Sequence, residues 1–356
     1  MKASIALLKS GFAILMMIFG TLRRKTSMIG RTPLKVLITI DTEVWPRRQA
    51  WLEERLEGDL QRDMYGVTGD GEFGIAFQSQ MFRDHGLQGI FFVEPLFAYV
   101  VGIAPLVQIV NTIRKHDGGG IELHAHPEWL RHFSPPGLPE GMLVQHFHEL
   151  TAEQQASVLE LARKNLQSAG VARTRAFRAG NFGADLDTCR ALKGLGVLFD
   201  FSYNASFTRT WCKIQSPRPL FKPSALGGVI EFPMTCFRDW PGHIRHAQLC
   251  ACSFSEMRNA LNQAWRLGWR YFVILSHSAE LLKRTARPQE AILNRVALHR
   301  LEHLCRFLRD NNDRFTTITC ETLDPADAAE PEPGYPLPGW YWNTVVRYVQ
   351  QGWARL

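Results

Sequence analysis

Short apolar runs alternate with helical patterns along this chain from Leu34 onward, and this alternation restricts the folds that the chain can adopt. Most of the runs lack polar residues at every second position, as expected for strands buried on both faces of a parallel sheet. Repeated strand–helix units favour an α/β fold whose parallel sheet closes, or nearly closes, into a barrel. Strands are predicted at Lys35–Ile40, Gly89–Val93, Gly120–His124, Arg175–Arg178, Val197–Phe201, Val229–Phe232, Tyr271–Ser276 and Phe315–Thr319. Helices are predicted at Ala76–His85, Pro105–His116, Ala152–Ala169, Asp185–Leu195, Ser255–Leu267 and Ala291–Asn311.

Polar side chains follow several predicted strands at the points where those strands end. The carboxyl ends of parallel strands meet at one face of an α/β barrel, so these side chains should lie close together. Taken singly, each has a structural explanation, such as a helix cap, an ion pair or a buried histidine. Together they predict a catalytic site, and its candidate members are Asp41, Glu43, His124, His126, Arg178, Asp200 and His277.

The segment Ile121–Trp129 carries two histidines two residues apart, directly after an apolar run. Because Pro127 ends the strand, the chain can turn there, and His124 can face one point together with either His126 or Glu128. Two histidines and a carboxylate are the ligands of an open catalytic Zn²⁺ site or a related divalent site. The sequence therefore predicts hydrolysis at a divalent metal centre, most simply one of Zn²⁺.

Motifs in a definite order follow these strands, and they span Leu34 to Leu323. They are Thr39–Glu43, Gly89–Val93, Glu122–His126, Phe177–Phe182, Phe199–Ser202, Glu231–Pro233 and Leu275–His277. In type and order they resemble the motifs of the polysaccharide deacetylase (NodB-homology) family, the metal-dependent carbohydrate N- and O-deacetylases. The resemblance implies a distorted (β/α)₇ barrel.

The resemblance also implies a role for individual residues. Asp41 would be the general base that takes a proton from a metal-activated water, and Arg178 would pair with Asp41 and keep it ionised and oriented. Glu43 and His124 would be metal ligands. His277 would be the general acid that protonates the leaving amine.

Two departures from the family pattern affect this assignment. Thr42 stands where the family has a second Asp, so the carboxylate ligand moves one residue on, to Glu43. The family's second histidine lies four residues after the first, a position that Glu128 holds here. We assign the third ligand to His126, which suits zinc better. The fourth motif adds Asp200 to the expected catalytic residues.

The predicted function is removal of an acyl group, acetyl, from an N-acetylated sugar or polysaccharide. A groove lined with exposed aromatic residues, with Trp45, Trp129 and Trp240 as candidates, would favour a glycan. A closed pocket would favour the first alternative, an amidase for small amides. The second alternative is a catalytically inactive homologue that binds glycans without turnover.

Composition narrows the range of partners and compartments. The chain has 356 residues, 46% of them hydrophobic, and a net charge of +7. Its basic residues do not form runs with interleaved aromatics, so nucleic acid is not an expected partner, whereas an anionic glycan or membrane surface is. The seven cysteines lack a framework spacing, which predicts reduced thiols in a reducing compartment.

The two ends of the chain differ from the predicted barrel, residues 34–323. Residues 1–28 are apolar, with a core too short for a typical membrane span and a basic flank at residues 23–25. They predict a cytoplasmic enzyme, anchored at the inner membrane by residues 4–22, or a chain that starts at Met28. The Pro-rich residues 324–338 predict a linker, and residues 339–356 a C-terminal helix that packs back on the domain.

Overall fold

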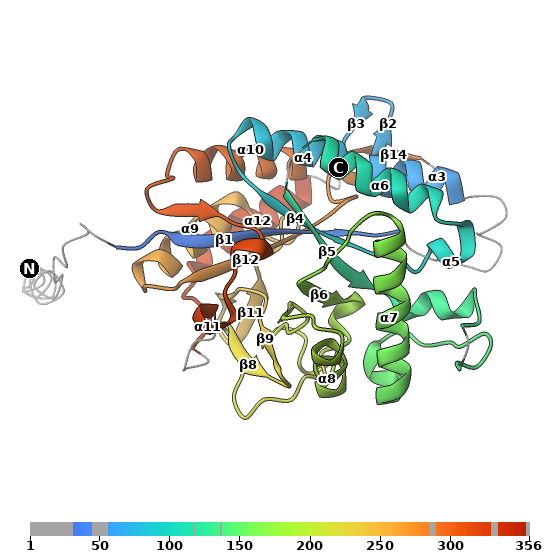
Figure 1. Ribbon diagram of the computed structural model, residues 1–356. Coiled ribbons are helices and arrows are strands. Elements are labelled where there is room, and N and C mark those ends of the chain that lie inside the picture. The colour runs from blue at the N-terminus through green and yellow to red at the C-terminus, as the bar shows by residue number, and fades with distance from the viewer. Residues whose placement is uncertain are drawn as a thin grey trace, which may run out of the picture. The chain divides into compact units, whose positions relative to one another are not determined.

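A curled and mostly parallel sheet forms the centre of the molecule (Figure 1). The computed structural model describes residues 31–44, 56–116, 119–135, 137–284, 290–328 and 334–353. Residues Pro33–Leu356 form one compact unit, and the architecture is that of this unit. The strands of the sheet are β1 (Leu34–Thr42), β4 (Gly89–Val93), β5 (Gly119–Ala125), β6 (Ala176–Ala179), β7 (Phe199–Asp200), β8 (Ser224–Leu226), β9 (Val229–Glu231), β12 (Tyr271–His277) and β15 (Phe315–Thr317).

Seven of these strands run parallel in the order β12-β1-β4-β5-β6-β7-β9, with β8 antiparallel at the end and β15 paired with the start of β1. The irregular segment 247–249 connects β12 with the chain that follows β9. The Ala247 amide donates to the Thr235 carbonyl (2.8 Å), and the Leu275 amide of β12 donates to the Ala247 carbonyl (2.9 Å). The predicted distorted (β/α)₇ barrel is confirmed as a curled sheet of seven parallel strands.

Helices cover the outside of the curled sheet, and Figure 1 shows α4, α6 and α10 along one side of it. Contacts between neighbouring helices link α9 to α10, α10 to α4, α4 to α6, and α7 to α8. Their bounds are α4 (Ile75–Asp84), α6 (Ala104–Lys115), α7 (Ala152–Ser168), α8 (Leu186–Gly194), α9 (Phe254–Arg266) and α10 (Arg295–Arg309).

Side chains at the helix starts explain where three of these helices begin. A capping box starts α7, with the Gln154 amide donating to the Thr151 hydroxyl. Capping boxes also start α8, at Asp185, and α9, at Ser253. These boxes satisfy backbone amides that the first helical turn leaves without partners.

The helix predicted at Ala291–Asn311 begins four residues later than expected, as α10. The Asn294 side chain accepts a hydrogen bond from the Ala297 amide and caps the helix. The preceding residues form β14 (Ala291–Leu293), which pairs with β13 (Leu282–Arg284). The apolar residues of β14 also fit the pattern of a first helical turn, which explains the difference.

Shorter elements connect the main ones. Two further hairpins are formed by β2 (Val67–Thr68) with β3 (Gly71–Glu72), and by β10 (Cys236–Trp240) with β11 (His243–His246). Short helices are α3 (Leu56–Leu60), α5 (Ala98–Val101) and α11 (Pro325–Ala328), with a π-helical turn at Gln61–Tyr65. Turns of 3₁₀ helix lie at Pro127–Arg131, Phe147–Glu149, Gly180–Phe182 and Cys320–Thr322.

The described residues near the C-terminal end of the chain pack against the domain. Residues 324–338, expected to be a linker, contain α11 and the fully buried Leu337, which exchanges backbone hydrogen bonds with β10. The helix α12 (Tyr341–Trp353) then contacts β10 and α9. The predicted N-terminal segment 1–28 and Trp45 lie outside the described residues. Among the described helices, none combines the length and apolar character needed to cross a bilayer.

Candidate metal centre

A cleft of about 170 Å³ opens at the carboxyl ends of the parallel strands. Strand β1 contributes Asp41, β5 is followed by His126, and β12 ends with His277. Parallel pairing places Asp41 directly beside His277 on the neighbouring strand. Six of the seven predicted site residues line this cleft or contact a residue that does, and they are Asp41, Glu43, His124, His126, Arg178 and His277.

Three buried side chains bring metal-ligating atoms together at the floor of the cleft. The Glu43 Oε2 atom lies 2.5 Å from His126 Nε2 and 3.0 Å from His124 Nε2. All three ligand atoms lie within 4.8 Å of one another. The two imidazole rings meet edge to face, with their centroids 4.9 Å apart.

The other ring nitrogen of each histidine, Nδ1, forms a hydrogen bond outside the triad. His124 Nδ1 donates to the Arg178 carbonyl (2.7 Å), and His126 Nδ1 donates to Glu128 Oε2 (2.7 Å). The second Glu128 oxygen accepts from the Asn181 amide group (2.9 Å). With Nδ1 acting as donor in both rings, the Nε2 lone pairs can face Glu43, which is the tautomer that metal ligation requires.

This arrangement separates the roles of His126 and Glu128, which the sequence left as alternatives. Glu128 orients His126 and is not among the three converging atoms. Two imidazoles and one carboxylate match the protein ligands of an open catalytic zinc site. The donor set therefore fits a divalent cation, with Glu43, His124 and His126 as its holders.

The pKa values in the triad reflect strong mutual interaction. Burial raises the pKa of Glu43, but the charge and hydrogen bonds of His126 and His124 outweigh it, so that the pKa lies well below the usual value. Burial lowers the pKa of His126, and the carboxylates of Glu43 and Glu128 outweigh that effect and raise it well above the usual value. A negative Glu43 and a proton on His126 therefore stabilise each other, and a cation held by the triad would take the place of that proton.

A buried ion pair holds the second carboxylate of the cleft. Arg178 Nη1 donates to Asp41 Oδ1 (2.6 Å), and its Nη2 donates to the Thr39 hydroxyl (2.9 Å). The guanidinium also lies 4.6 Å from the centroid of the Phe92 ring. Since Arg178 is fully buried, these contacts compensate for the water that its charge has lost.

His277 is supported by a carboxylate that sequence reasoning missed. Its Nδ1 lies 2.7 Å from Glu280 Oε2, and Glu280 in turn accepts from the Cys250 amide (2.8 Å). Burial lowers the pKa of His277, but Glu280, Asp41 and Glu43 raise it to about 9. The imidazolium is therefore the main form at neutral pH. The sequence signal that could have identified Glu280 is its position three residues after His277, a histidine at a strand end.

Asp200, expected among the catalytic residues, does not line the cleft. It is fully buried and accepts from the Ser202 hydroxyl (2.5 Å), and this hydroxyl accepts from the Ala179 amide (2.9 Å). Burial raises the pKa of Asp200 and of its neighbour Glu231, which interact directly. Asp200 thus holds the backbone at the end of β6 and contacts no residue of the triad.

A strained turn after β6 supports the metal centre. Asn181 and Phe182 both adopt left-handed backbone conformations, with φ of 53° and 56°. A Cβ atom on Gly180 would lie about 2.5 Å from the His126 ring, so only glycine allows this approach. The turn lets Asn181 reach Glu128 while Gly180 makes room for His126.

The aromatic walls of the cleft differ from those expected. Trp129 is fully buried, and Trp240 lies on β10 outside the cleft lining. Phe207 and Trp211 line it instead, with ring centroids 4.8 Å apart. His246, at the end of β11, and Gln248 also line the cleft, and neither belongs to a sequence motif that could have identified it.

No model of a protein family matches the chain, and no curated protein matches it in sequence. Solved structures with a related arrangement include a family 4 carbohydrate esterase from Streptomyces lividans, with 12% identity over 85% of this chain and 100% of that one, and a TM-score of 0.40. A peptidoglycan deacetylase from Bacillus subtilis has 8% identity over 90% and 98% of the two chains, with a TM-score of 0.36. A 4-alpha-glucanotransferase from Thermococcus litoralis has 11% identity over 90% and 46%, with a TM-score of 0.49. Such distant likeness leaves the chemistry to be argued from the cleft itself.

Proposed function

We propose that this protein is a metal-dependent hydrolase that removes the acetyl group from an N-acetylated sugar or polysaccharide. The observation that carries the proposal is the convergence in one cleft of a metal-ligand triad, a carboxylate base and a protonated histidine. Amide hydrolysis needs these three functions: activation of water and carbonyl, removal of a proton, and protonation of the leaving nitrogen.

The base side of the cleft consists of Asp41 and the residues that hold it. A divalent cation held by Glu43, His124 and His126 would polarise the acyl carbonyl and make the attacking water more acidic. Asp41 takes the proton of that water. Because Arg178 donates to one oxygen of this carboxylate, Asp41 cannot rotate freely out of the cleft.

The acid side consists of His277 and Glu280. His277 donates a proton to the nitrogen that leaves when the C–N bond breaks, a step for which its pKa of about 9 keeps it protonated. Glu280 fixes Nδ1, so the proton is delivered from Nε2. Since Asp41 and His277 are paired residues of β1 and β12, base and acid flank the same scissile bond.

The size and walls of the cleft support a glycan substrate. A volume of about 170 Å³ is below the ~300 Å³ at which pockets begin to enclose a whole small-molecule ligand. It suits an acetamido group whose sugar ring remains outside. At the rim, Trp211 is 43% exposed, with its ring tilted against that of Phe207 and stacked near that of His146, and its exposed part offers an aromatic surface for a pyranose ring.

Metal content, measured by elemental mass spectrometry on the full chain, tests the proposal together with acetate release from N-acetylated chito-oligosaccharides. We expect about one divalent ion per chain, lost in His124→Ala together with activity. His146→Ala is the matched control for metal content, because His146 belongs to a second His/Glu cluster that does not line the cleft. For acetate release the control is His85→Ala, because the His146 ring stacks on that of Trp211 and His85 lies outside the cleft lining.

Three results would contradict the proposal. A metal that is lost in His146→Ala but kept in His124→Ala would place the ion elsewhere. Release of acetate only from small non-sugar amides would support the amidase alternative. Binding of glycan without metal or turnover would support the inactive homologue.

A further inference from the structure

The helix α12 is attached to the domain through its polar side, and its apolar side is exposed. On a helical wheel its apolar side chains fall within an arc of roughly 160°, opposite its polar side chains. In a surface helix the apolar side normally faces the core. Here Thr344 and Arg347 are buried, whereas Trp342, Tyr348 and Val349 are exposed.

Hydrogen bonds from the polar side hold α12 in place. The Thr344 hydroxyl donates to the Asp239 carbonyl (2.9 Å), and Arg347 Nη2 donates to the Asp239 carboxylate (3.1 Å). Arg347 Nε lies 3.3 Å from Glu256 Oε1. Because Asp239 and Glu256 are buried as well, the charge of Arg347 is compensated inside the protein, and these ion pairs hold α12 in this orientation.

The outward side of α12 forms a continuous apolar surface, here named the α12 face. Trp342 is 79% exposed at its N-terminal end, and the centre is occupied by valines. Trp240 on the β10–β11 hairpin extends the surface, with its ring 5.7 Å from that of Tyr341. The residues of the face on the helix are Tyr341, Trp342, Val345, Val346, Tyr348 and Val349.

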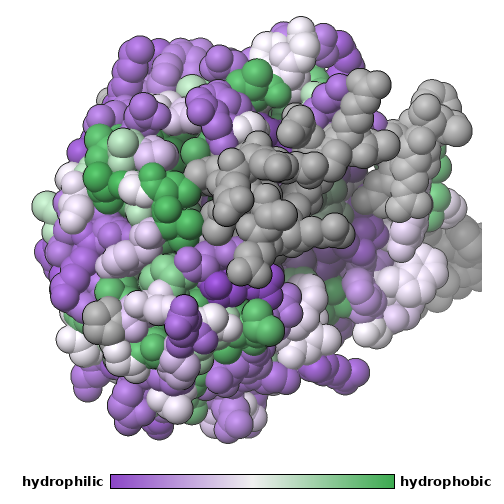
Figure 2. All heavy atoms as spheres, turned by 90° about the vertical axis from the view of Figure 1, so that its right-hand side faces the viewer, coloured by the Kyte–Doolittle hydropathy of each residue, from purple (hydrophilic) through white to green (hydrophobic). Residues whose placement is uncertain are grey.

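Another face of the molecule offers a contrast. On the side shown in Figure 2, hydrophobic residues occur in small groups separated by hydrophilic ones. Scattered apolar residues are normal on a protein surface, whereas a continuous apolar face marks an interaction site.

The charges around the α12 face are positive. The sequence contains no Asp or Glu from Gly334 to Leu356. Arg238 is exposed and lies two residues before the exposed Trp240 on β10, while Asp239 between them is buried. On α9, Arg258 is exposed and lies over the Phe254 ring at 5.6 Å.

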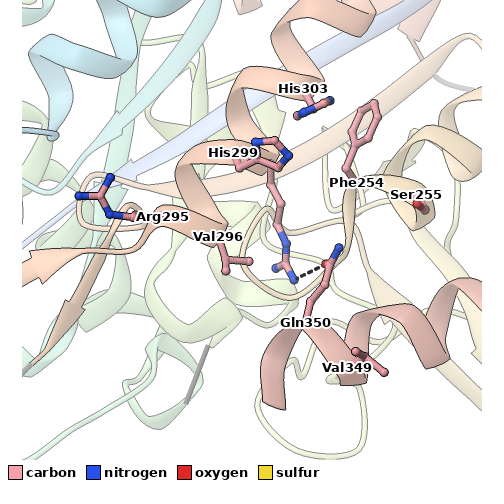
Figure 3. Close-up of a pocket in the computed structure, with 9 residues that line it drawn as sticks. Phe254, Ser255, Arg295, Val296, His299, His303, Val349 and Gln350 are labelled. Atoms are coloured by element: carbon pink, nitrogen blue, oxygen red, sulfur yellow. Dashed lines mark hydrogen bonds between the residues drawn. The ribbon is translucent and has the colours of Figure 1, made fainter. Parts of the chain in front are cut away.

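A cavity of about 630 Å³ borders the α12 face (Figure 3). Val349 and Gln350 of α12 form one wall, and Phe254 lies at the start of α9. The opposite wall is α10, from which His299 and Arg295 line the cavity. The cavity therefore combines an apolar lining with cationic and imidazole groups, which suits an acidic amphiphile.

We propose that the α12 face docks on an anionic membrane surface. A valine centre with tryptophan and tyrosine around it is the composition of helices that lie in the lipid interface. The exposed side chains of Arg238 and Arg258 provide the complementary charge for acidic headgroups. The proposal is independent of the reaction in the cleft.

A second copy of the chain is a poorer occupant. In a two-fold dimer the same patch meets itself, so that the positive charges beside the α12 face would oppose one another. A glycan is also poorer, because sugars stack on exposed aromatic rings and gain little from the valines in the centre.

Quenching of tryptophan fluorescence by brominated phosphatidylglycerol vesicles tests the proposal on the full chain. We expect vesicle-dependent quenching in the wild type and a clear loss of it in Trp342→Phe. Trp211→Phe is the matched control, since Trp211 is an exposed tryptophan in the cleft. Both variants contain residues 1–28, so any vesicle binding by that segment is the same in both. The difference in quenching between them therefore reports α12.

Vesicle sedimentation provides the second measurement. We expect the double variant Val345→Ser/Val349→Ser to bind phosphatidylglycerol vesicles about tenfold more weakly, with unchanged thermal stability. Equal quenching loss in Trp342→Phe and Trp211→Phe would overturn the proposal. A dimer in light scattering that the double variant dissociates would overturn it in favour of self-association.

Discussion

The cleft and the α12 face are both supported by buried polar side chains, but they expose different groups. The cleft presents polar reactive groups, and α12 presents apolar side chains. In the cleft, each supporting partner lies behind the reactive group: Glu128 behind His126, and Glu280 behind His277. At α12, Thr344 and Arg347 themselves form the attachment, and the apolar side chains remain outside. Buried polar pairs thus prepare a reactive surface in one region and a hydrophobic surface in the other.

The difference shows what hydrophobic periodicity can and cannot establish. Periodicity indicates that one side of a helix will leave water, but it does not indicate what will cover that side. In α12, the match of Arg347 to Asp239 and Glu256 decides the orientation, because an unpaired buried charge would cost more than an exposed valine.

The largest expected effect lies in the cleft, where Asp41→Asn removes the base but no metal ligand. We expect turnover to fall by about 10²–10⁴-fold with metal content unchanged. Initial rates and elemental analysis of one preparation measure both quantities. Wild-type activity in Asp41→Asn would exclude Asp41 as the base.

At α12 the corresponding change is Arg347→Met, which leaves Asp239 and Glu256 buried without their shared cation. We expect the free energy of unfolding to fall by about 3 kcal/mol, measured by urea titration. Arg258→Met, at an exposed site, should change it by less than about 0.5 kcal/mol. Equal effects of both substitutions would mean that α12 is not held by its polar side.

The role of Glu128 can be separated from that of a ligand by Glu128→Gln. We expect affinity for the divalent ion to fall by about 10–100-fold, as for other second-sphere partners of ligating histidines. Competition with a chelator provides the affinity. Loss of the metal as complete as in His124→Ala would instead make Glu128 a direct ligand.

The Glu280→Gln variant tests the acid through its pH dependence. His277 acts when protonated, so wild-type kcat/KM should fall only as pH rises through about 9. Without the carboxylate the pKa falls toward its usual value of about 6.5, and kcat/KM at pH 8 should drop roughly tenfold or more, with little change at pH 6. A parallel loss at all pH values would contradict proton donation by His277.

The same raised pKa affects stability in the same pH range. Because the folded protein binds this proton more tightly than the unfolded chain, the His277–Glu280 pair stabilises the fold fully below pH 6.5. That contribution is lost as pH rises through about 9. Thermal midpoints of wild type and Glu280→Gln should therefore converge at high pH.

Much of the fold could be predicted from the sequence, because strand ends in a parallel sheet have a common direction. The runs that end at Asp41, His124 and His277 were each placed correctly, and their convergence followed from topology alone. Asp200 obeys the same rule, yet its side chain turns to Ser202 within the protein. Position at a strand end does not determine which way a side chain turns.

The remaining features depended on tertiary contacts that no local pattern encodes. His126 was assigned as a ligand from its chemistry, but the position of its ring depends on the turn at Gly180, which lies far away in sequence. The aromatic rim comes from an irregular loop containing Phe207 and Trp211. The orientation of α12 depends on two acids of other elements, which periodicity within one helix cannot reveal.

The pairing of β1 with β12 has a consequence for repeated turnover. In the proposed reaction Asp41 ends a cycle protonated and His277 ends it neutral, so one proton must travel back before the next cycle. Arg178 stabilises the anion of Asp41, and Glu280 stabilises the cation of His277. Both supports therefore favour transfer of this proton from Asp41 on β1 to His277 on β12. This transfer restores the starting protonation states of base and acid as the product leaves.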